Sequence, residues 1–355
     1  MSEETTHIPK AVLYIAKQHP WSIAAQVCLI EKGYGADEVD LRLVDLGKGE
    51  NYAPTFLRLN SQGTVPTLIV PFENTLSPAP GTEARFKAVT DIESIVLTLD
   101  RARSAASRTH TTSSAPAPAL APATIDSNSR ARTIITLLHS APASPELLFL
   151  MNARDASVLS TYSQTLRPFL SGRIEALSSF ASSQESANVK VSAKTRAFWE
   201  EKKVAAQKLL NGVESEGKDR EEYFENSKAA WEVGLGAVLN KLSAEIVGPF
   251  TLGDQFSTAD VHLSAWLAYV VYLAGGSPSE TGAVAIEKLE KHVGGGFLLP
   301  RISEAAGTGS GVSGGDEATP KAAEEPPRST TKLGVFWDAA RERPSWKAVE
   351  EALAQ

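Results

Sequence analysis

Apolar residues in the first hundred positions are grouped in short runs separated by polar turns. Residues 11–16 (AVLYIA) form a run whose length suits a buried strand. The next segment places apolar side chains at helical spacing and stops at Gly33, which predicts a helix with a glycine stop. Residues 38–46 alternate apolar and charged side chains, and residues 67–70 follow Pro66 as a third apolar run, so both are predicted strands. Further elements are expected at 51–59 (a short helix), 85–88 (a weak strand) and 89–101 (a helix).

Beyond residue 130 the apolar spacing is helical and predicts no strand. A β/α half followed by an all-α half predicts two domains of different class. We therefore expect an α/β domain at residues 1–103 and an all-helical domain at residues 130–355. The expected helices of the second domain are 130–139, 145–180, 190–211, 222–245, 257–274, 281–292 and 334–353.

Two segments have compositions that favour mobility. Residues 104–129 are rich in Ala, Ser, Thr and Pro, and residues 305–330 are rich in Gly, Ala, Glu and Pro with no aromatic residue. Because neither segment has much apolar surface to bury, neither offsets the entropy cost of ordering its backbone. We predict a low-complexity linker at 104–129, a mobile loop at 305–330, and a loop or frayed helix end near 211–222.

The bulk composition narrows the class of protein. The 355-residue chain is 42% hydrophobic and 22% charged, which is typical of a globular protein with room for two cores. A net charge of −7 argues against a nucleic-acid-binding protein, which usually carries a basic balance. No apolar run approaches about 18 residues, the first ten residues are mostly polar, and Cys28 is the only cysteine. These features predict no membrane span, no secretory signal, no internal disulfide and a cytoplasmic location.

Two local motifs give sharper structural predictions than the periodicity. In GTVPTL (63–68), a proline stands directly before a predicted strand. In FTLGDQFSTADVHLSAWL (250–267), Ser257 and Asp260 have the spacing of a capping box, in which each side chain accepts from the other's main-chain N–H. The helix that follows is apolar on nearly all sides, so we expect it to be buried.

These motifs resemble those of glutathione transferases. The runs 13–33 and 44–71 are similar to the first three strands of that family and the helices between them. The runs 250–267 and 337–353 are similar to its central and closing helices. The resemblance is to a divergent member of fungal type. It implies a thioredoxin-like α/β N-terminal domain followed by an all-α C-terminal helical bundle.

The resemblance implies that a residue at the start of the first helix activates the thiol of glutathione. Such proteins lower the thiol pKa with a hydrogen-bond donor and the positive end of that helix. The family's catalytic serine or cysteine position falls on His19, whose imidazole N–H can donate to a thiolate; the alternative is a partly exposed loop histidine. Ser22 is a second candidate donor, with a capping role in the first turn as the alternative. Cys28 lies about two turns into the helix, so we expect a small core residue there.

The same resemblance implies a set of glutathione-binding residues. A cis bond between Val65 and Pro66 would turn the main chain of Val65 toward the cysteinyl part of the ligand, which pairs with it like an added strand. Asp91 stands where the family has an acid for the γ-glutamyl end; the alternative is an acid favoured there by the helix dipole. Ile92 replaces the family's serine, and Tyr52 replaces its lysine. The remaining implied residues are Thr90, as a cap and hydroxyl donor, and Asn51 and Lys48, near the position of the missing lysine.

Two functions remain open. The first is a glutathione transferase that conjugates glutathione, as co-substrate, to small hydrophobic electrophiles, or cleaves such bonds, in detoxification. The second is a non-catalytic binding or regulatory module with the same fold. The histidines and acids lack metal-ligand spacing, so no metal site is predicted. The resemblance also implies a homodimer, and it makes Trp266 and Tyr269 candidates to reach a cleft for the hydrophobic substrate, with core packing as the alternative.

Overall fold

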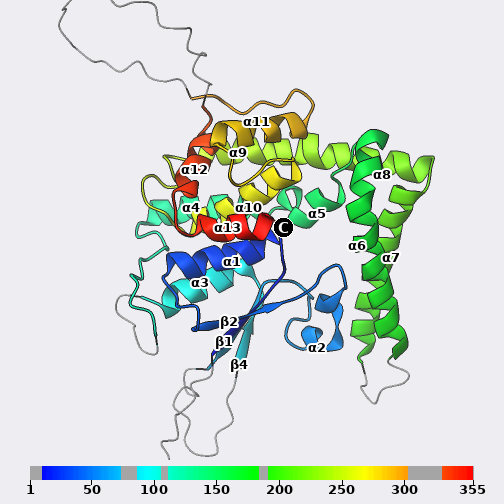
Figure 1. The fold of residues 1–355 in the computed structure, drawn as a ribbon, viewed down its shortest axis with the longest axis horizontal. Coiled ribbons are helices and arrows are strands. Elements are labelled where there is room, and N and C mark those ends of the chain that lie inside the picture. Colours follow the sequence, from blue (N-terminus) through cyan, green and yellow to red (C-terminus); the bar gives the residue numbers. More distant parts are fainter. Residues whose placement is uncertain (1–9, 73–85, 105–110, 184–190, 303–329, 355) are drawn as a thin grey trace, which may run out of the picture.

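The computed structural model describes residues 10–72, 86–104, 111–183, 191–302 and 330–354. Its α/β part is a four-stranded sheet with the order β2-β1-β3-β4 (Figure 1). β1 pairs in parallel with β2 and antiparallel with β3, and β3 pairs antiparallel with β4. The elements are β1 (Ala11–Ile15), α1 (Pro20–Glu31), β2 (Val39–Leu43), a 3₁₀ turn (Glu50–Tyr52), α2 (Pro54–Leu57), β3 (Thr67–Pro71), β4 (Phe86–Val89) and α3 (Ile92–Ala102). The predicted α/β domain, including its weak fourth strand, is confirmed.

The rest of the described chain is helical, as predicted. Its helices surround α10, which lies in the middle of the molecule (Figure 1). They are α4 (Ile125–Leu138), a 3₁₀ turn (Ala141–Ala143), α5 (Pro145–Leu150), α6 (Ala156–Ser183), α7 (Ala193–Glu214), α8 (Lys218–Lys228), a π-helical segment (Ala229–Leu235), α9 (Gly236–Glu245), α10 (Thr258–Leu273), α11 (Gly282–Val293), α12 (Lys332–Arg341) and α13 (Trp346–Leu353).

Helix α1 joins the two parts. It packs against α3 on one side and against α10 and α13 on the other, and nine of its twelve residues are buried. Pro20 begins the helix at a position where a missing N–H leaves no hydrogen bond unmade. The predicted glycine stop is confirmed at Gly33, which has φ 69° and lies so close to Pro116 that an added Cβ would stand 2.5 Å from its carbonyl oxygen. Cys28 is fully buried, as expected, and burial raises the pKa of its thiol.

Helix α10 begins with the predicted capping box. Asp260 Oδ2 accepts from the main-chain N–H of Ser257 at 2.7 Å, and its Oδ1 accepts from the N–H of Thr251 at 2.7 Å. Asp260 is fully buried, and this burial raises its pKa to about 6 against the opposing effect of its hydrogen bonds. Fifteen of the sixteen helix residues are buried, which confirms that this helix forms the core.

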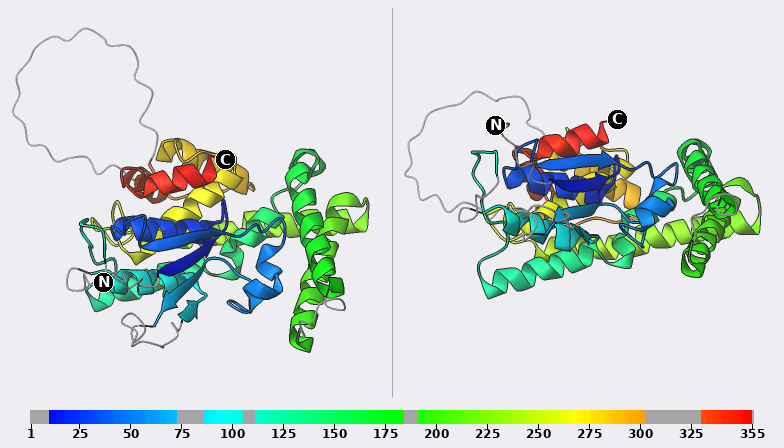
Figure 2. Two further views of the ribbon diagram at one scale, coloured as in Figure 1. Left: turned by 60° about the horizontal axis from the view of Figure 1, so that its bottom comes forward. Right: turned by 90° about the horizontal axis from the view of Figure 1, so that it is seen from below.

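Helices α6 and α7 lie side by side at one side of the molecule, with α8 packed against α7 (Figure 2). They reach the α/β part through the turn before α2, where Trp199 Nε1 donates to the main-chain oxygen of Tyr52 at 3.0 Å. The Arg173 guanidinium lies 5.6 Å from the centre of the Tyr52 ring. Tyr52 is therefore a packing residue of this contact, and only 5% of its surface is exposed.

Two predicted helices are divided in the structure, and one predicted loop is mostly helix. The helix expected at 145–180 is broken between α5 and α6, where the Asn152 side chain donates to the Leu273 carbonyl at 3.0 Å. The helix expected at 334–353 is divided into α12 and α13 by the turn at 342–345. The helix expected at 222–245 is continuous, with a π-helical segment between α8 and α9. The loop expected near 211–222 is mostly helix, because α7 runs to Glu214 and α8 begins at Lys218.

The linker predicted at 104–129 is held against the protein in its described part. Leu120 is 2% exposed within the main core, and its N–H donates to the Asp100 carboxylate at 2.9 Å. Helix α4 already begins at Ile125. Leu120 is the one buried residue of 111–129, so the prediction that this segment has little to bury holds for the other residues. The composition did not predict that other parts of the chain supply hydrogen-bond partners for its main chain.

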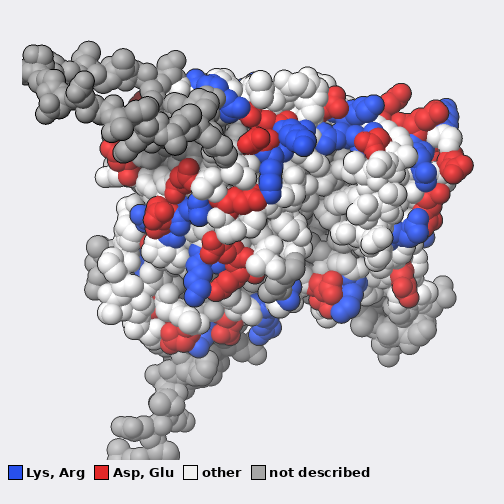
Figure 3. Space-filling model, turned by 45° about the horizontal axis from the view of Figure 1, so that its top comes forward, with Lys and Arg blue, Asp and Glu red and all other residues white. Residues whose placement is uncertain are grey.

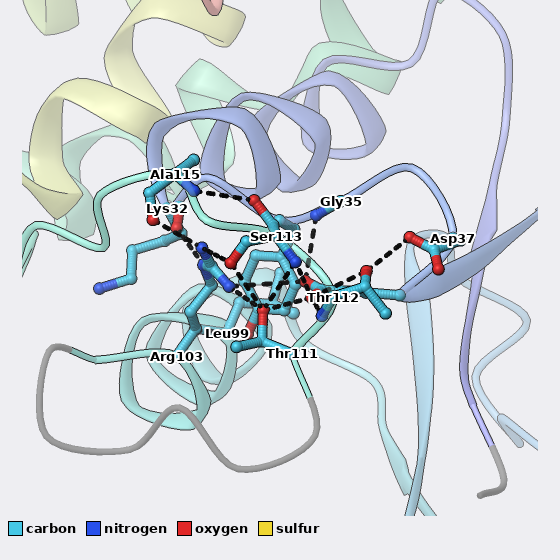
Figure 4. Close-up of polar contacts among 11 residues, drawn as sticks. Lys32, Gly35, Asp37, Leu99, Arg103, Thr111, Thr112, Ser113 and Ala115 are labelled. Carbon is cyan, nitrogen blue, oxygen red and sulfur yellow. Dashed lines mark hydrogen bonds and ion pairs between the residues drawn. The ribbon is translucent and has the colours of Figure 1, made fainter.

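Two side chains from the α/β part hold residues 111–115 in place (Figure 4). Arg103 Nε donates to the main-chain oxygen of Lys32 at 2.7 Å, and Arg103 Nη2 donates to that of Ala115 at 2.8 Å. The Glu38 carboxylate accepts from the N–H of Ser113 at 3.1 Å and lies 3.7 Å from the Arg103 guanidinium. Side chains thus satisfy main-chain groups that neither a helix nor a strand pairs.

Acidic and basic side chains are interspersed over the face of the molecule in Figure 3. Among the helices of the described ranges, none is long and apolar enough to cross a membrane. The loop predicted at 305–330 falls almost wholly outside the described residues.

Candidate functional site

A pocket of about 310 Å³ opens where the α/β part meets the C-terminal end of α4. It is bounded by residues 64–66 before β3, residues 90–93 at the start of α3, Trp21 of α1 and His139 after α4. Four of the predicted site residues line it together: Val65, Pro66, Thr90 and Asp91. The other four, His19, Ser22, Asn51 and Lys48, are not among the lining residues.

The turn before β3 presents main-chain groups to this pocket. The bond between Val65 and Pro66 is cis, as predicted. Asn60 holds the turn, since its side-chain nitrogen donates to the Thr64 carbonyl at 2.9 Å and to the Thr67 hydroxyl at 3.0 Å. Among the described residues, no hydrogen bond engages the main-chain N–H or C=O of Val65. Both groups are therefore available to an extended ligand.

The start of α3 forms the opposite wall. Asp91 is the N-cap, and its Oδ1 accepts from the N–H of Ser94 at 2.8 Å. Thr90 was expected to cap this helix, and that prediction is wrong because Asp91 occupies the capping position. Ile92 is buried, so its side chain packs inward where a serine would present a hydroxyl. The N–H groups at the first helical positions, together with the helix dipole, favour an anionic ligand group here.

His19 and Ser22 flank Trp21 at the start of α1. Ser22 is fully buried; its hydroxyl oxygen accepts from the N–H of Ala16 at 3.1 Å and lies 3.5 Å from His19 Nδ1. The hydroxyl proton can therefore point to Nδ1, which leaves Nε2 as the protonated ring nitrogen. Desolvation lowers the pKa of His19 to about 4, outweighing the raising effect of Glu146, so the ring is neutral at pH 7. Gln18, just before it, has φ 54° and is the one non-glycine residue of the described chain with positive φ.

Lys48 and Asn51 lie away from the pocket. The Lys48 side chain is 77% exposed and forms an ion pair with Asp45 at 3.2 Å. Asn51 is 3% exposed; its nitrogen donates to the Gly63 carbonyl at 2.7 Å, and its oxygen has no hydrogen-bond partner in the described chain. Their roles in glutathione binding stay predictions.

Two histidines of the helical part were not predicted for the site. His139 lines the pocket and stacks on the Trp21 ring, with centroids 4.2 Å apart. Its Nε2 lies 3.1 Å from Nδ1 of His262, which comes from α10 and is fully buried. The spacing of 123 residues between the two histidines gives no sequence signal for this contact. The sequence offered no reason to place Trp21 in the site other than its position next to His19 and Ser22.

Two further expectations concern the core and metals. Trp266 does not reach a cleft, because it is fully buried and its Nε1 donates to the Ala143 carbonyl at 2.7 Å. Tyr269 is 8% exposed, and burial raises the pKa of its hydroxyl. Within the described ranges, no group of three or more His, Cys, Asp or Glu side chains is placed to hold a metal ion.

The order of the strands and the cis turn decide the fold. The sheet has the order β2-β1-β3-β4, with β1 and β2 parallel. A cis-proline stands immediately before β3, and an all-helical part follows the sheet. The chain has the glutathione transferase fold.

Comparisons with known proteins find structures that are similar to this chain only at low sequence identity. No protein-family model matches the chain, and no curated protein matches it. The beta-etherase LigF from Sphingobium sp. strain SYK-6 is 14% identical, with 97% of this chain and 99% of that chain covered and a TM-score of 0.48. Glutathione transferase F7 from Populus trichocarpa is 13% identical, with 97% and 99% covered and a TM-score of 0.44. A glutathione transferase homologue from Sulfitobacter, solved with bound glutathione, is 14% identical, with 80% and 90% covered and a TM-score of 0.38.

Three histidines with lowered pKa values predict a loss of stability in mild acid. Desolvation lowers the pKa of His19 and His292 to about 4 and that of His262 to about 3, from 6.5. The unfolded chain therefore binds more protons below pH 6.5, so the stability held above this pH is lost progressively as the pH falls toward 4. Asp260, with its pKa raised to about 6, opposes this trend but is a single group. We expect the thermal unfolding midpoint to fall steadily from pH 7 to pH 4.5; a constant midpoint would contradict the prediction.

Proposed function

We propose that this chain binds glutathione in the pocket between the cis turn and α3. The observation that carries the proposal is that unpaired main-chain groups of Val65 and the N-terminus of α3 face one cavity of about 310 Å³. The N–H and C=O of Val65 would pair with the cysteinyl part of the ligand as with an added strand. The γ-glutamyl carboxylate would lie at the helix N-terminus, and its ammonium beside Asp91. Pro66 and Thr90 complete the wall of this site.

We further propose transferase chemistry at the start of α1. No side chain caps α1, so its first N–H groups and dipole are available to a thiolate. His19, neutral and protonated on Nε2, would donate to the sulfur, and Ser22 would hold that tautomer through Nδ1. The thiol proton leaves to solvent. The thiolate then attacks the carbon of a hydrophobic electrophile, the S–C bond forms, and the leaving group departs with its electron pair.

Binding without turnover is the second candidate function. Ser22 is fully buried with its oxygen already engaged by Ala16, and Lys48 points away from the pocket. These features favour a glutathione-binding module in which the thiol is held but not strongly activated. A cytoplasmic location, a role in detoxification and a homodimer extend the first candidate.

The two candidates differ in the effect of His19→Ala. If His19 activates the thiol, this substitution is expected to lower kcat/KM for conjugation to an aromatic halide about 10- to 100-fold, because a charge-assisted hydrogen bond to the thiolate is lost. Calorimetry should show glutathione binding by the wild type and by His19→Ala alike. The matched control is His292→Ala, a histidine on α11 bonded to Asn152 at 2.6 Å.

Each outcome selects one reading. Binding without conjugation in the wild type supports the binding module. Full activity of His19→Ala shows that its imidazole does not activate the thiol. Absence of binding at millimolar glutathione overturns both candidates.

A further inference from the structure

Two aromatic side chains, one from each part of the molecule, line the pocket, and a third buried ring packs against them. Trp21 of α1 and His139 at the end of α4 line the pocket, and the buried His262 comes from the second turn of α10. The Trp21 and His139 rings are stacked, with centroids 4.2 Å apart and planes 26° apart. The His262 ring stands at 78° to His139, and its centroid is 5.9 Å from that of Trp21. The wall is therefore fixed by contacts between two domains.

The ring of His139 is exposed, but it is not free to turn. Trp21 supports one face, and His139 Nε2 lies 3.1 Å from His262 Nδ1. Nε2 is thus engaged by the protein, and Nδ1 has no hydrogen-bond partner among the described residues. A ring fixed by stacking and one hydrogen bond offers its second nitrogen at a defined position, which lowers the entropy cost of ligand binding.

His262 couples the protonation of that second nitrogen to its own tautomer. It is 1% exposed, and desolvation lowers its pKa to about 3; partial burial also lowers the pKa of His139. Two neutral rings share one proton between Nε2 and Nδ1, so His139 Nδ1 donates when His262 supplies that proton and accepts when His139 supplies it. The pair can therefore serve a carboxylate or an ammonium group.

Asp91 and His139 line the same pocket. The charge of Asp91 raises the pKa of His139, although the larger effect of desolvation lowers it. Asp91 also caps α3, whose first N–H groups favour a carboxylate. This end of the pocket therefore combines sites for an ammonium and a carboxylate, which only the γ-glutamyl residue of glutathione carries together.

We propose that His139, positioned by His262, hydrogen-bonds the γ-glutamyl end of glutathione through Nδ1, so that the helical domain takes part in ligand binding. This rests on the proposed function. His139 is then a binding residue, and His262 is a positioning residue that acts through it.

Calorimetry on paired variants tests the proposal. His139→Phe keeps the stack on Trp21 but removes both nitrogens, and we expect glutathione affinity to fall about five- to tenfold, as for one lost hydrogen bond. His139→Asn places a polar group near Nδ1 and should restore part of the affinity. His262→Leu should weaken binding similarly, and His262→Asn, which mimics Nδ1, should restore it. γ-Glutamylcysteine, which lacks the glycine, should show the same loss with His139→Phe.

The control is His292→Phe, which changes a partly buried histidine outside the pocket and should leave affinity unchanged. The ¹⁵N resonance of His139 Nδ1 should also shift when glutathione is added, which a purely structural role would not produce. Wild-type binding with unchanged affinity in His139→Phe overturns this inference alone. If the wild type does not bind glutathione, the proposed function fails and this inference fails with it.

Discussion

Replacing Asp100 with leucine is expected to lower the free energy of unfolding by about 3–5 kcal/mol. Asp100 Oδ1 lies 2.8 Å from Lys32 Nζ, and the two side chains are only 6% and 1% exposed. Leucine would leave the buried ammonium with the Pro118 carbonyl, 2.5 Å away, as its one partner in the described chain. The N–H of Leu120 would lose its acceptor as well. Urea unfolding followed by circular dichroism measures the loss.

Two variants separate the buried charge from general damage to the core. Lys32→Met combined with Asp100→Leu should be more stable than Asp100→Leu alone, because the unpaired ammonium is gone. Glu222→Leu breaks a pair with Lys208 at the same 2.8 Å distance, but those side chains are 45% and 74% exposed. Its effect should be much smaller than that of Asp100→Leu, because solvent screens an exposed pair. Equal losses for Asp100→Leu and Glu222→Leu would contradict the role of burial.

The sequence predicted those features whose cause is local. The resemblance carried by GTVPTL (63–68) predicted the cis turn, and the spacing of Ser257 and Asp260 predicted the capping box. Both depend on residues within a few positions of each other. The helical periodicity likewise predicted most helices, because each needs only its own apolar face. It failed at 229–235, where a π-helical segment continues the helical pattern without a break in composition.

Features that depend on distant partners were missed. Nothing in the composition of 111–124 indicates that Arg103 and Asp100 satisfy its main-chain groups. Strand alternation predicted β2, yet Leu41 and Leu43 are 49% and 61% exposed, because an edge strand lacks a neighbour on one side. The partners of residues 111–124 and the exposure of β2 depend on how the elements pack together, and the periodicity of one segment carries no information about that packing.

In the candidate site, too, the residues in continuous motifs were predicted and those paired across distant elements were missed. The resemblance identified Val65, before β3, and Asp91, at the start of α3, and both line the pocket. His139 and His262 were missed because their pairing joins α4 to α10 across the helical domain. The resemblance supplied the residues of the α/β part, where the motifs are short and continuous. It supplied none for the wall built by the helical part.

Arg343→Met is expected to lower the free energy of unfolding by about 3 kcal/mol, the lower end of the range for breaking a buried ion pair. Glu31, at the end of α1, has a side chain only 3% exposed. Arg343 Nε and Nη2 donate to its two carboxylate oxygens at 3.2 and 2.5 Å, and the Ser345 hydroxyl donates at 2.5 Å. Methionine keeps the apolar stem but leaves a buried carboxylate with one donor. Because Arg343 is 36% exposed, water can replace part of the lost bond, which limits the effect.

The same pair links α1, which carries His19 at its other end, to the turn between α12 and α13. Chemical denaturation of Arg343→Met can be compared with Arg341→Met, which removes two exposed contacts, one with Asp338 at 3.5 Å and one with the Ser279 carbonyl at 3.0 Å, and should change stability by about 1 kcal/mol or less. Glu31→Gln should lose less than Arg343→Met, since a neutral amide is less costly to bury than an unpaired carboxylate. If Arg343→Met and Arg341→Met are equally stable, the Glu31 pair does not hold the closing helices to the α/β domain.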